Sequence, residues 1–314
     1  MQLKSRALLG QISDIDLRLL RVFVAVADCG SMAAAELELN IAMSTISRHI
    51  KNLETRLGLV LCRRGRSGFA LTPEGERVYA ATRQLLSATA AFRGRLLDIH
   101  ERMEGDLHVA LFEKCVSNPD ARIAEAVGNF RRLAPAASLH LHVGSITMIE
   151  RGVIDGHYQL GVVPLHRPSE SLCYDDLFGE TMYLYAGRGH AWFAGTDEER
   201  DWGALRSQAL AGLGYHSPNM ELTHHRRLER SATASDQEAV ATLVLSGAFV
   251  GFLPDHFAEP FVRAGRMRAV APEVLNYTCR FACIHRHAPA PLRIAEAFLD
   301  CLLTAHGMDR TPGR

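Results

Sequence analysis

Residues 23–58 read FVAVADCGSMAAAELELNIAMSTISRHIKNLETRLG, and this stretch decides the fold of the first part of the chain. It predicts a short alanine-rich helix over residues 32–39 with Ser31 as its cap, a turn at Asn40, and a longer helix over residues 43–57. One side of the longer helix is apolar and the other carries polar and basic groups; the apolar side comprises Ile46, Ile50, Leu53 and Leu57, and the polar side Ser44, Arg48, Lys51 and Thr55. Two helices around a tight turn, the second built in this way, are typical of a helix-turn-helix.

The flanking residues extend this motif to a winged helix-turn-helix. Before it, we expect Asp16 to cap a helix that begins at Leu17 and ends at Gly30. After it, residues 59–75 read LVLCRRGRSGFALTPEG, in which a basic, glycine-containing turn separates two short segments of strand character. This pattern predicts a β-hairpin wing with its arginines placed along phosphate.

The charge of the chain is unevenly distributed. In total, 35 basic side chains balance 35 acidic ones. Residues 42–71 nevertheless contain a single acid, Glu54, against six basic residues: Arg48, Lys51, Arg56, Arg63, Arg64 and Arg66. A local basic segment in a neutral protein favours a DNA-binding module joined to a neutral domain. Charge alone fits a solvated helix face beside a basic loop equally well.

A long helix follows, from the Thr72-Pro73-Glu74 start to about residue 103. Its apolar positions recur every seven residues, at Val78, Leu85, Phe92 and Ile99. An isolated helix cannot bury such a seam, so we expect a second subunit to cover it in a dimer. The alternative is packing against the helix's own chain.

From residue 105 the pattern changes to alternating strands and helices. Strands are predicted near residues 107–111, 139–143 and 160–163, with helices between them. A less regular second set follows, with strands near residues 182–185, 210–213, 249–253 and 278–285, a capping box at residues 235–238 before a helix over 239–245, and a final helix over residues 291–303. Two α/β lobes joined by two crossings explain this order. The predicted fold class is therefore α/β, with a winged helix-turn-helix over residues 15–72, a linker helix over 73–104 and a two-lobed domain over 105–306.

Several function classes lack support in the sequence. The seven cysteines include no C-x-x-C pair, which favours reduced thiols in the cytoplasm over a disulfide framework. We find no signal-peptide core and no apolar run of membrane-spanning length. Phosphate-binding loops, dinucleotide fingerprints and nucleophile elbows are also missing, and His224-His225 has no further ligand at zinc spacing. We therefore expect no metal, no cofactor and no enzyme activity.

Residues 17–75 resemble the DNA-binding domain of the LysR-type transcription regulators. The resemblance combines F-x-x-V-A, G-S before the alanine-rich helix, S-x-x-I-x-x-L-E-x-x-L-G, R-G-R-x-G and L-T-x-x-G, and weaker matches continue through GDLHVAL, ERGVIDGHYQLGVVP and LSGAFVGFLP. It implies a dimerising linker helix, an effector domain shaped like a two-lobed solute-binding protein, and tetramers on promoter DNA. The chain departs from the family pattern at Ala42 and Met43, where Ser and Gln are usual. Ala42 is a poor helix cap, at a cost on the order of 1 kcal/mol.

These observations select two groups of candidate residues. For DNA contacts we expect Ser44, Thr45, Ser47, Arg48, Lys51, Arg63, Arg64 and Arg66. Arg48 suits a guanine edge or a phosphate, and the other basic residues suit phosphate. Effector contacts are expected from loops at strand ends and helix starts, which suit a carboxylate: Glu113, Lys114, Cys115, Ser145, Ile146, Tyr215, His216, Ala234 and Ser235. The acid Glu113 additionally favours an amino group on the ligand.

The leading interpretation is a ligand-responsive regulator that binds promoter DNA, a small effector, further copies of itself and RNA polymerase. One alternative is a solute-binding or carrier protein, which the basic motif and the free thiols disfavour. Another is an enzyme fused to a DNA-binding domain. For Cys115 two interpretations remain: a redox role, or a buried thiol without reactivity. The effector, the operator and the direction of regulation have no signature in the sequence.

Overall fold

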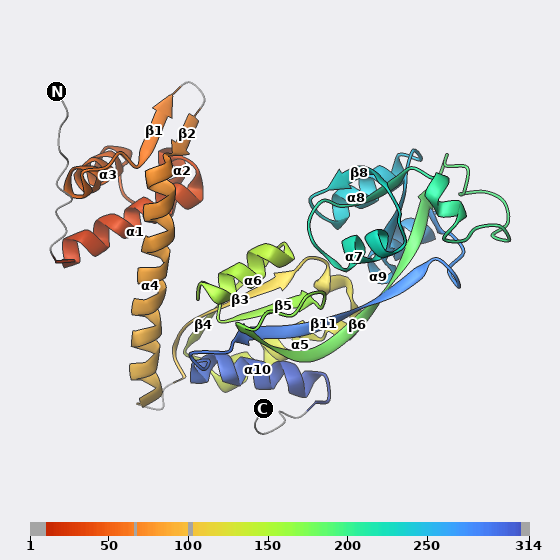
Figure 1. Ribbon diagram of the computed structural model, residues 1–314. Coiled ribbons are helices and arrows are strands. Elements are labelled where there is room, and N and C mark those ends of the chain that lie inside the picture. Colours follow the sequence, from red (N-terminus) through yellow and green to blue (C-terminus); the bar gives the residue numbers. More distant parts are fainter. Residues whose placement is uncertain (1–10, 66–67, 100–102, 309–314) are drawn as a thin grey trace. The chain divides into compact units, whose positions relative to one another are not determined.

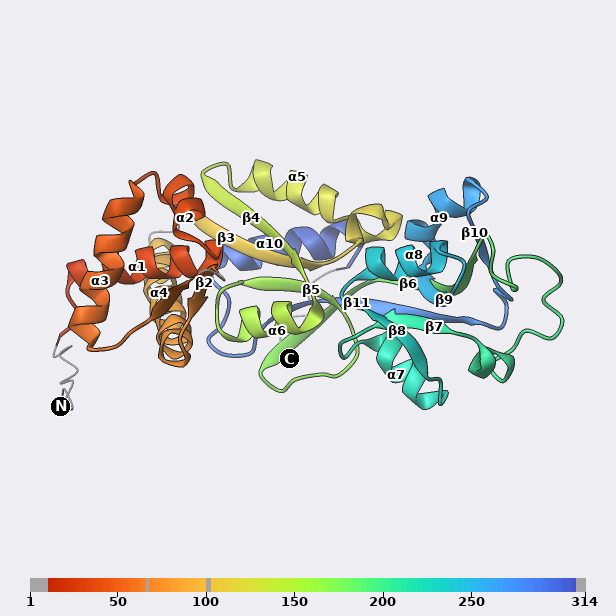
Figure 2. The same ribbon diagram turned by 90° about the horizontal axis from the view of Figure 1, so that it is seen from above.

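The computed structural model describes residues 11–65, 68–99 and 103–308, whose contacts divide the chain into two compact units. The first unit extends to Arg93 and the second begins at Gly94. Figures 1 and 2 show the helices of the first unit and the twisted sheet of the second. The division lies within residues 73–104, where the sequence predicts the linker helix.

The first unit has a three-helix core, a β-hairpin and most of a long helix. Its elements are α1 (Asp14–Cys29), α2 (Met32–Leu39), α3 (Met43–Leu57), β1 (Cys62–Gly65), β2 (Gly68–Leu71) and α4 (Pro73–Ile99). Phe23 and Ile46 are completely buried in its core. The three core helices end at left-handed residues, Gly30, Asn40 and Gly58. The predicted helix-turn-helix and wing are both present.

The start of α1 differs from the prediction. Ser13 is the N-cap: its hydroxyl accepts a hydrogen bond from the Asp16 amide at 3.4 Å, and the Asp16 carboxylate accepts one from the Ser13 amide at 2.9 Å. This reciprocal pair is a capping box. The prediction that Asp16 caps a helix beginning at Leu17 is therefore wrong, because Asp16 lies inside the first turn.

The apolar seam of α4 has two parts. Val78 and Leu85 are partly buried and pack against the core of the first unit. Near the other end of the helix, Phe92 and Ile99 are 65% and 74% exposed. The sequence left open, as an alternative, that the seam packs against its own chain. This alternative accounts for the first part of the seam only.

The second unit is built on one nine-stranded sheet with the order β4-β3-β5-β11-β6-β9-β7-β8, and β10 pairs with β6. The strands are β3 (Gly105–Phe112), β4 (Ala137–Gly144), β5 (Leu160–Pro164), β6 (Leu172–Gly187), β7 (Leu210–Leu213), β8 (Arg230–Ala234), β9 (Val250–Pro254), β10 (Met267–Ala269) and β11 (Asn276–Arg286). Pairing is parallel within the β4-β3-β5 and β9-β7-β8 groups. The β4-β3-β5 group forms the lobe-one part of this sheet, and the β9-β7-β8 group forms the lobe-two part.

Two long strands connect the lobes. β6 and β11 pair antiparallel from Leu172↔Arg286 to Tyr183↔Asn276. β11 also pairs with β5 of lobe one, and β6 with β9 of lobe two. Both strands therefore run from one lobe into the other, as Figures 1 and 2 show. The two predicted crossings are these strands.

Helices cover both faces of each lobe. They are α5 (Ile123–Leu133), α6 (Ile146–Ile154), α7 (Pro218–His225), α8 (Gln237–Leu245), α9 (Asp255–Arg263) and α10 (Arg293–Ala305), with 3₁₀ turns at Cys115–Ser117, Pro119–Ala121 and Ala204–Ser207. In Figure 2, α5 and α10 lie on one face of lobe one and α6 on the other; α8 and α9 lie opposite α7 in lobe two. Phe130 of α5 meets Phe298 of α10 edge to face, at 5.3 Å between ring centroids.

Several elements differ from the sequence prediction. The described part of α4 reaches Ile99, and the predicted end near residue 103 adjoins residues 100–102, which lie outside the described ranges. β6 is far longer than the predicted residues 182–185, because it changes partners along its length and its buried positions do not alternate regularly. α7, β8, α9 and β10 were not predicted. Short elements of this kind depend on tertiary packing more than on local pattern.

Candidate functional site

The candidate DNA interface centres on α3. Ile46, Ile50 and Leu53 bury one side of this helix with at most 1% exposure. On the opposite side, Ser44, Arg48 and Lys51 are exposed, and Thr45 and Ser47 are partly exposed. The five residues predicted on this helix thus share one accessible surface, which has the composition that suits the major groove.

Two acidic side chains hold α3 in place. The Asp16 side chain, 0% exposed, accepts from Arg56 Nε at 2.5 Å and from Nη2 at 2.9 Å. These hydrogen bonds, with those from Ser13, lower the pKa of Asp16 well below its usual range. At the other end of the helix, the Glu36 carboxylate accepts from the Met43 amide at 3.1 Å. Ala42, the N-cap of α3, makes no side-chain hydrogen bond to the helix start. Glu36 supplies the missing acceptor.

The wing is joined to the same helix. Glu54, the single acid of the basic segment, accepts from the Leu61 amide at 2.8 Å. Arg63 is exposed on β1. Arg64 lies on β1 without a described side chain, and Arg66 lies outside the described residues. Glu54 thus has a structural role that its position in the sequence did not suggest.

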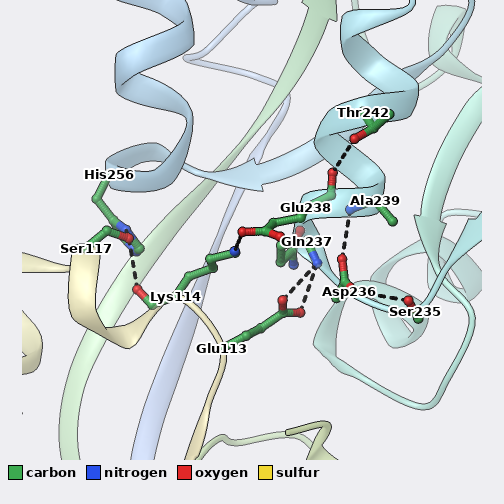
Figure 3. A network of polar contacts seen from close by, with 10 residues as sticks. All are labelled: Glu113, Lys114, Ser117, Ser235, Asp236, Gln237, Glu238, Ala239, Thr242 and His256. Atoms are coloured by element: carbon green, nitrogen blue, oxygen red, sulfur yellow. Dashed lines mark hydrogen bonds and ion pairs between the residues drawn. The ribbon is translucent and has the colours of Figure 1, made fainter. Parts of the chain in front are cut away.

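In the second unit, the loop after β3 contacts the start of α8, across the junction of the lobes (Figure 3). Both oxygens of Glu113 accept from the Gln237 amide, at 2.9 and 3.1 Å. The neighbouring Lys114 forms an ion pair with Glu238, at 2.6 Å between Nζ and Oε1. Lys114 Nζ also lies 4.5 Å from the centroid of the Phe257 ring. Residues 124 positions apart in sequence therefore close this junction.

The start of α8 differs from the expected capping box. Asp236 is the N-cap, and its carboxylate accepts from the Ala239 amide at 2.8 Å. Ser235, the residue that heads the predicted box, instead donates to Asp236 at 3.0 Å. The cap is one residue later because α8 begins at Gln237, so Gln237 and Glu238 face the loop after β3.

Burial shapes the chemistry of this junction. It raises the pKa of Glu113 to about 7, and the negative charges of Asp236 and Glu238 act in the same direction. It also raises the pKa of the Cys115 thiol. A thiol that stays protonated at neutral pH is a poor nucleophile, which favours the inert role over a redox role.

The other predicted effector residues lie in different surroundings. Ser145 caps α6 by accepting from the Met148 amide at 3.4 Å, and Ile146 is completely buried, so its side chain belongs to the core of lobe one. Ala234 is also buried, at the end of β8. His216 is exposed, and its ring centroid lies 5.1 Å from that of His166. Within the described residues, no side-chain hydrogen bond or ion pair joins Ser145, Ile146, Ala234 or His216 to Glu113.

Tyr215 is partly buried, and its hydroxyl has no hydrogen-bond partner among the described residues. Burial raises the pKa of Tyr215, and the nearby charges of Glu113 and Asp236 raise it further. Tyr215 and Ser235, which donates to Asp236, therefore belong to the surroundings of Glu113, unlike His216 and Ala234.

One further contact at the junction was missed from the sequence. Ser117 Oγ lies 2.9 Å from His256 Nδ1, and His256 Nε2 lies 3.0 Å from Glu180 Oε2. The side chains of His256 and Glu180 are each 7% exposed. The three residues come from the loop after β3, from α9 and from β6, so no local motif could have indicated them. Within the described ranges, no group of three or more His, Cys, Asp or Glu is arranged to hold a metal ion.

Comparisons with known proteins match both units. The model for "Bacterial regulatory helix-turn-helix protein, lysR family" matches residues 17–76, and that for "LysR substrate binding domain" matches residues 100–307. The HTH-type transcriptional activator BauR of Pseudomonas aeruginosa is 39% identical over 294 residues, 94% of this chain and 96% of BauR. The regulator CrgA of Neisseria meningitidis is 27% identical over 302 residues, 92% of this chain and 96% of CrgA.

Solved structures confirm the fold. That of CbnR, a LysR family transcriptional regulator, aligns with a TM-score of 0.62 at 21% identity, over 92% of this chain and 99% of CbnR. Full-length CbnR in complex with its target DNA aligns with a TM-score of 0.61 over the same shares. The predicted winged helix-turn-helix with a two-lobed α/β effector domain is thus confirmed.

The matched proteins are transcription regulators and not enzymes. In the described parts of the chain, no helix combines the length and apolar character that crossing a membrane requires. The two family matches cover the chain in the order that the sequence predicts. The chain belongs to the LysR family of bacterial transcription regulators, with a DNA-binding helix-turn-helix unit and an effector-binding unit.

Proposed function

We propose that this regulator binds promoter DNA through α3 and the β1–β2 wing and responds to a small carboxylate bound between its two lobes. The observation that carries the proposal is the division of α3 into a fully buried apolar side and an exposed side with Ser44, Arg48 and Lys51. In this proposal residues 15–72 bind DNA, residues 73–104 form the dimerising helix, and residues 105–306 sense the effector.

On DNA, Arg48 reads a guanine edge or holds a phosphate, and Ser44, Thr45 and Ser47 allow the helix to approach the groove closely. Lys51 and the wing residues Arg63, Arg64 and Arg66 bind phosphate, which positions the protein without specifying sequence.

A gel-shift titration with the regulator's own promoter region tests the DNA assignment. Arg48→Ala should weaken specific binding by about 1–3 kcal/mol and relax the base preference at one position of each half-site. Arg77→Ala is the matched control, since Arg77 is 77% exposed on α4, outside the proposed DNA surface. Unchanged affinity and sequence preference for Arg48→Ala would refute the assignment of the recognition face.

The effector is proposed to bind where strand ends and helix starts of both lobes meet. Ser145 caps α6, whose first turn carries partial positive charge suited to a carboxylate. Tyr215 and His216 approach from lobe two, Glu113, Lys114, Cys115 and Ser235 lie in the surrounding loops, and Ile146 and Ala234 contribute through their backbone at the start of α6 and the end of β8. Effector binding can regulate only if the ligand prefers one arrangement of the lobes or subunits over another.

Assembly and cellular role complete the proposal. The exposed part of the α4 seam favours a dimer, and the LysR family supports a dimer of dimers. We place the protein in the cytoplasm, where promoter DNA and RNA polymerase are available to it. BauR, the relative at 39% identity, is named a transcriptional activator, which supports activation as the direction of regulation. Transcription in vitro with purified RNA polymerase, with and without the regulator, tests that direction.

A further inference from the structure

The junction between the loop after β3 and the start of α8 carries more negative than positive charge. Three acidic residues lie close together there: Glu113, Asp236 and Glu238. Among the described contacts of these residues, Lys114 provides the positive charge. Lys114 is already paired with Glu238. The Glu113 carboxylate accepts hydrogen bonds from the Gln237 amide, which carries no formal charge. The Glu113 carboxylate is thus partly buried without a cationic partner.

Independent of this charge, the junction holds unsatisfied hydrogen-bond acceptors. Gln237 is 4% exposed, and its Oε1 has no hydrogen-bond partner among the described residues. In Figure 3 Gln237 lies beside Glu238 at the start of α8, across from Glu113 and Lys114. The Tyr215 hydroxyl, near Glu113, is also without a partner in the described chain. A buried polar atom left unpaired is costly, so these atoms favour a ligand that donates hydrogen bonds.

The missing partner has the chemistry of an ammonium group. An ammonium ion supplies one positive charge and three N–H donors. Glu113 lacks a cation in its hydrogen bonds, Gln237 Oε1 can only accept, and the Tyr215 hydroxyl is able to accept as well. A bare metal ion fits less well, because the described chain holds no set of three or more His, Cys, Asp or Glu arranged as metal ligands.

We propose that this junction is the amine subsite of the effector pocket, in which Glu113 binds an ammonium group on a short aliphatic ligand and Gln237 and Tyr215 complete its hydrogen bonds. The proposal rests on the sensing function proposed above and narrows its ligand class. The effector is an aliphatic amino acid in the broad sense: its ammonium lies at Glu113 and its carboxylate at the start of α6. In the ligand-free protein, the α8 amide holds the Glu113 carboxylate in place of the ligand.

The test uses matched probes on the full-length protein: linear n-alkylamines, n-alkanoates and ω-amino acids with chains of three to six carbons. Melting temperature and calorimetric Kd are measured for wild type, Glu113→Gln and Glu170→Gln. The last variant makes the same change at an exposed acid of the same unit, outside the junction. Amine-bearing probes should stabilise wild type and Glu170→Gln, with binding to Glu113→Gln weakened about tenfold or more. Gln237→Leu, which keeps all charges, should weaken the same probes by about threefold.

Three results would overturn the amine subsite: equal amine binding to wild type and Glu113→Gln, binding of alkanoates but not of amines, or no stabilisation by any amine. A promoter gel shift in the presence of each probe separates this failure from a failure of the sensing function. If an alkanoate alters DNA binding and the amines do not, the regulator senses a ligand without an amine subsite. A circular dichroism spectrum and a cooperative melting transition like those of wild type show that the effector unit of Glu113→Gln is folded.

Discussion

Replacing Phe92 by Asp should break the dimer that we propose for α4. Phe92 is 65% exposed in the isolated chain. Complete burial of a phenylalanine side chain is worth about 1.5–3 kcal/mol, so covering this exposed part contributes about 1–2 kcal/mol per subunit and about 2–4 kcal/mol per symmetric dimer. Loss of that contribution alone weakens dimerisation about 30- to 700-fold, at a factor of ten per 1.4 kcal/mol. An aspartate adds the cost of burying an unpaired carboxylate.

Analytical ultracentrifugation over a concentration series gives the dimer dissociation constant directly. Leu37→Asp is the control, since Leu37 is 85% exposed on α2 of the same unit and is not on the seam. We expect wild type and Leu37→Asp to dissociate at the same concentration and Phe92→Asp at a concentration at least about 30-fold higher. If Phe92→Asp is folded by circular dichroism and dissociates like wild type, the exposed end of the α4 seam is not the dimer contact.

Three further predictions concern the effector unit and the packing of α4. Ser145→Met should leave promoter binding intact and abolish the response to effector; calorimetry that shows unchanged effector affinity would move the pocket elsewhere. Because the pKa of Glu113 is raised from 4.5 to about 7, the folded protein holds this proton more tightly than the unfolded chain, so the melting temperature should fall from about pH 5 to pH 7, level off above pH 7, and fall less in Glu113→Gln. A Cβ on Gly75 would lie 2.0 Å from the Leu61 carbonyl oxygen, whereas one on Gly128 meets nothing within 4 Å. In urea unfolding, Gly75→Ala should therefore destabilise by about 1–3 kcal/mol and Gly128→Ala should stabilise by about 1 kcal/mol, and equal effects would refute the packing argument.

The helix-turn-helix, the wing and the α/β character of the second unit could be predicted from the amino-acid pattern. These features rest on local signals, since the apolar stripe of Ile46, Ile50 and Leu53, the turn at Asn40 and the stop at Gly58 act within a few residues along the chain. The exposed side of α3 followed from the same periodicity. Its candidate DNA contacts could therefore be named without coordinates.

Only the tertiary structure decided which side chains meet. Glu113 reaches Gln237 across 124 residues, and Asp16 pairs with Arg56 across 40. Such contacts depend on how strands are ordered in the sheet and how helices pack, and pairing over long separations leaves no periodic pattern in the sequence. For the same reason the sequence suggested an anion-binding helix start at Ser235. In the folded chain that helix start already binds the Glu113 carboxylate, so a ligand that binds there is expected to carry a positive charge.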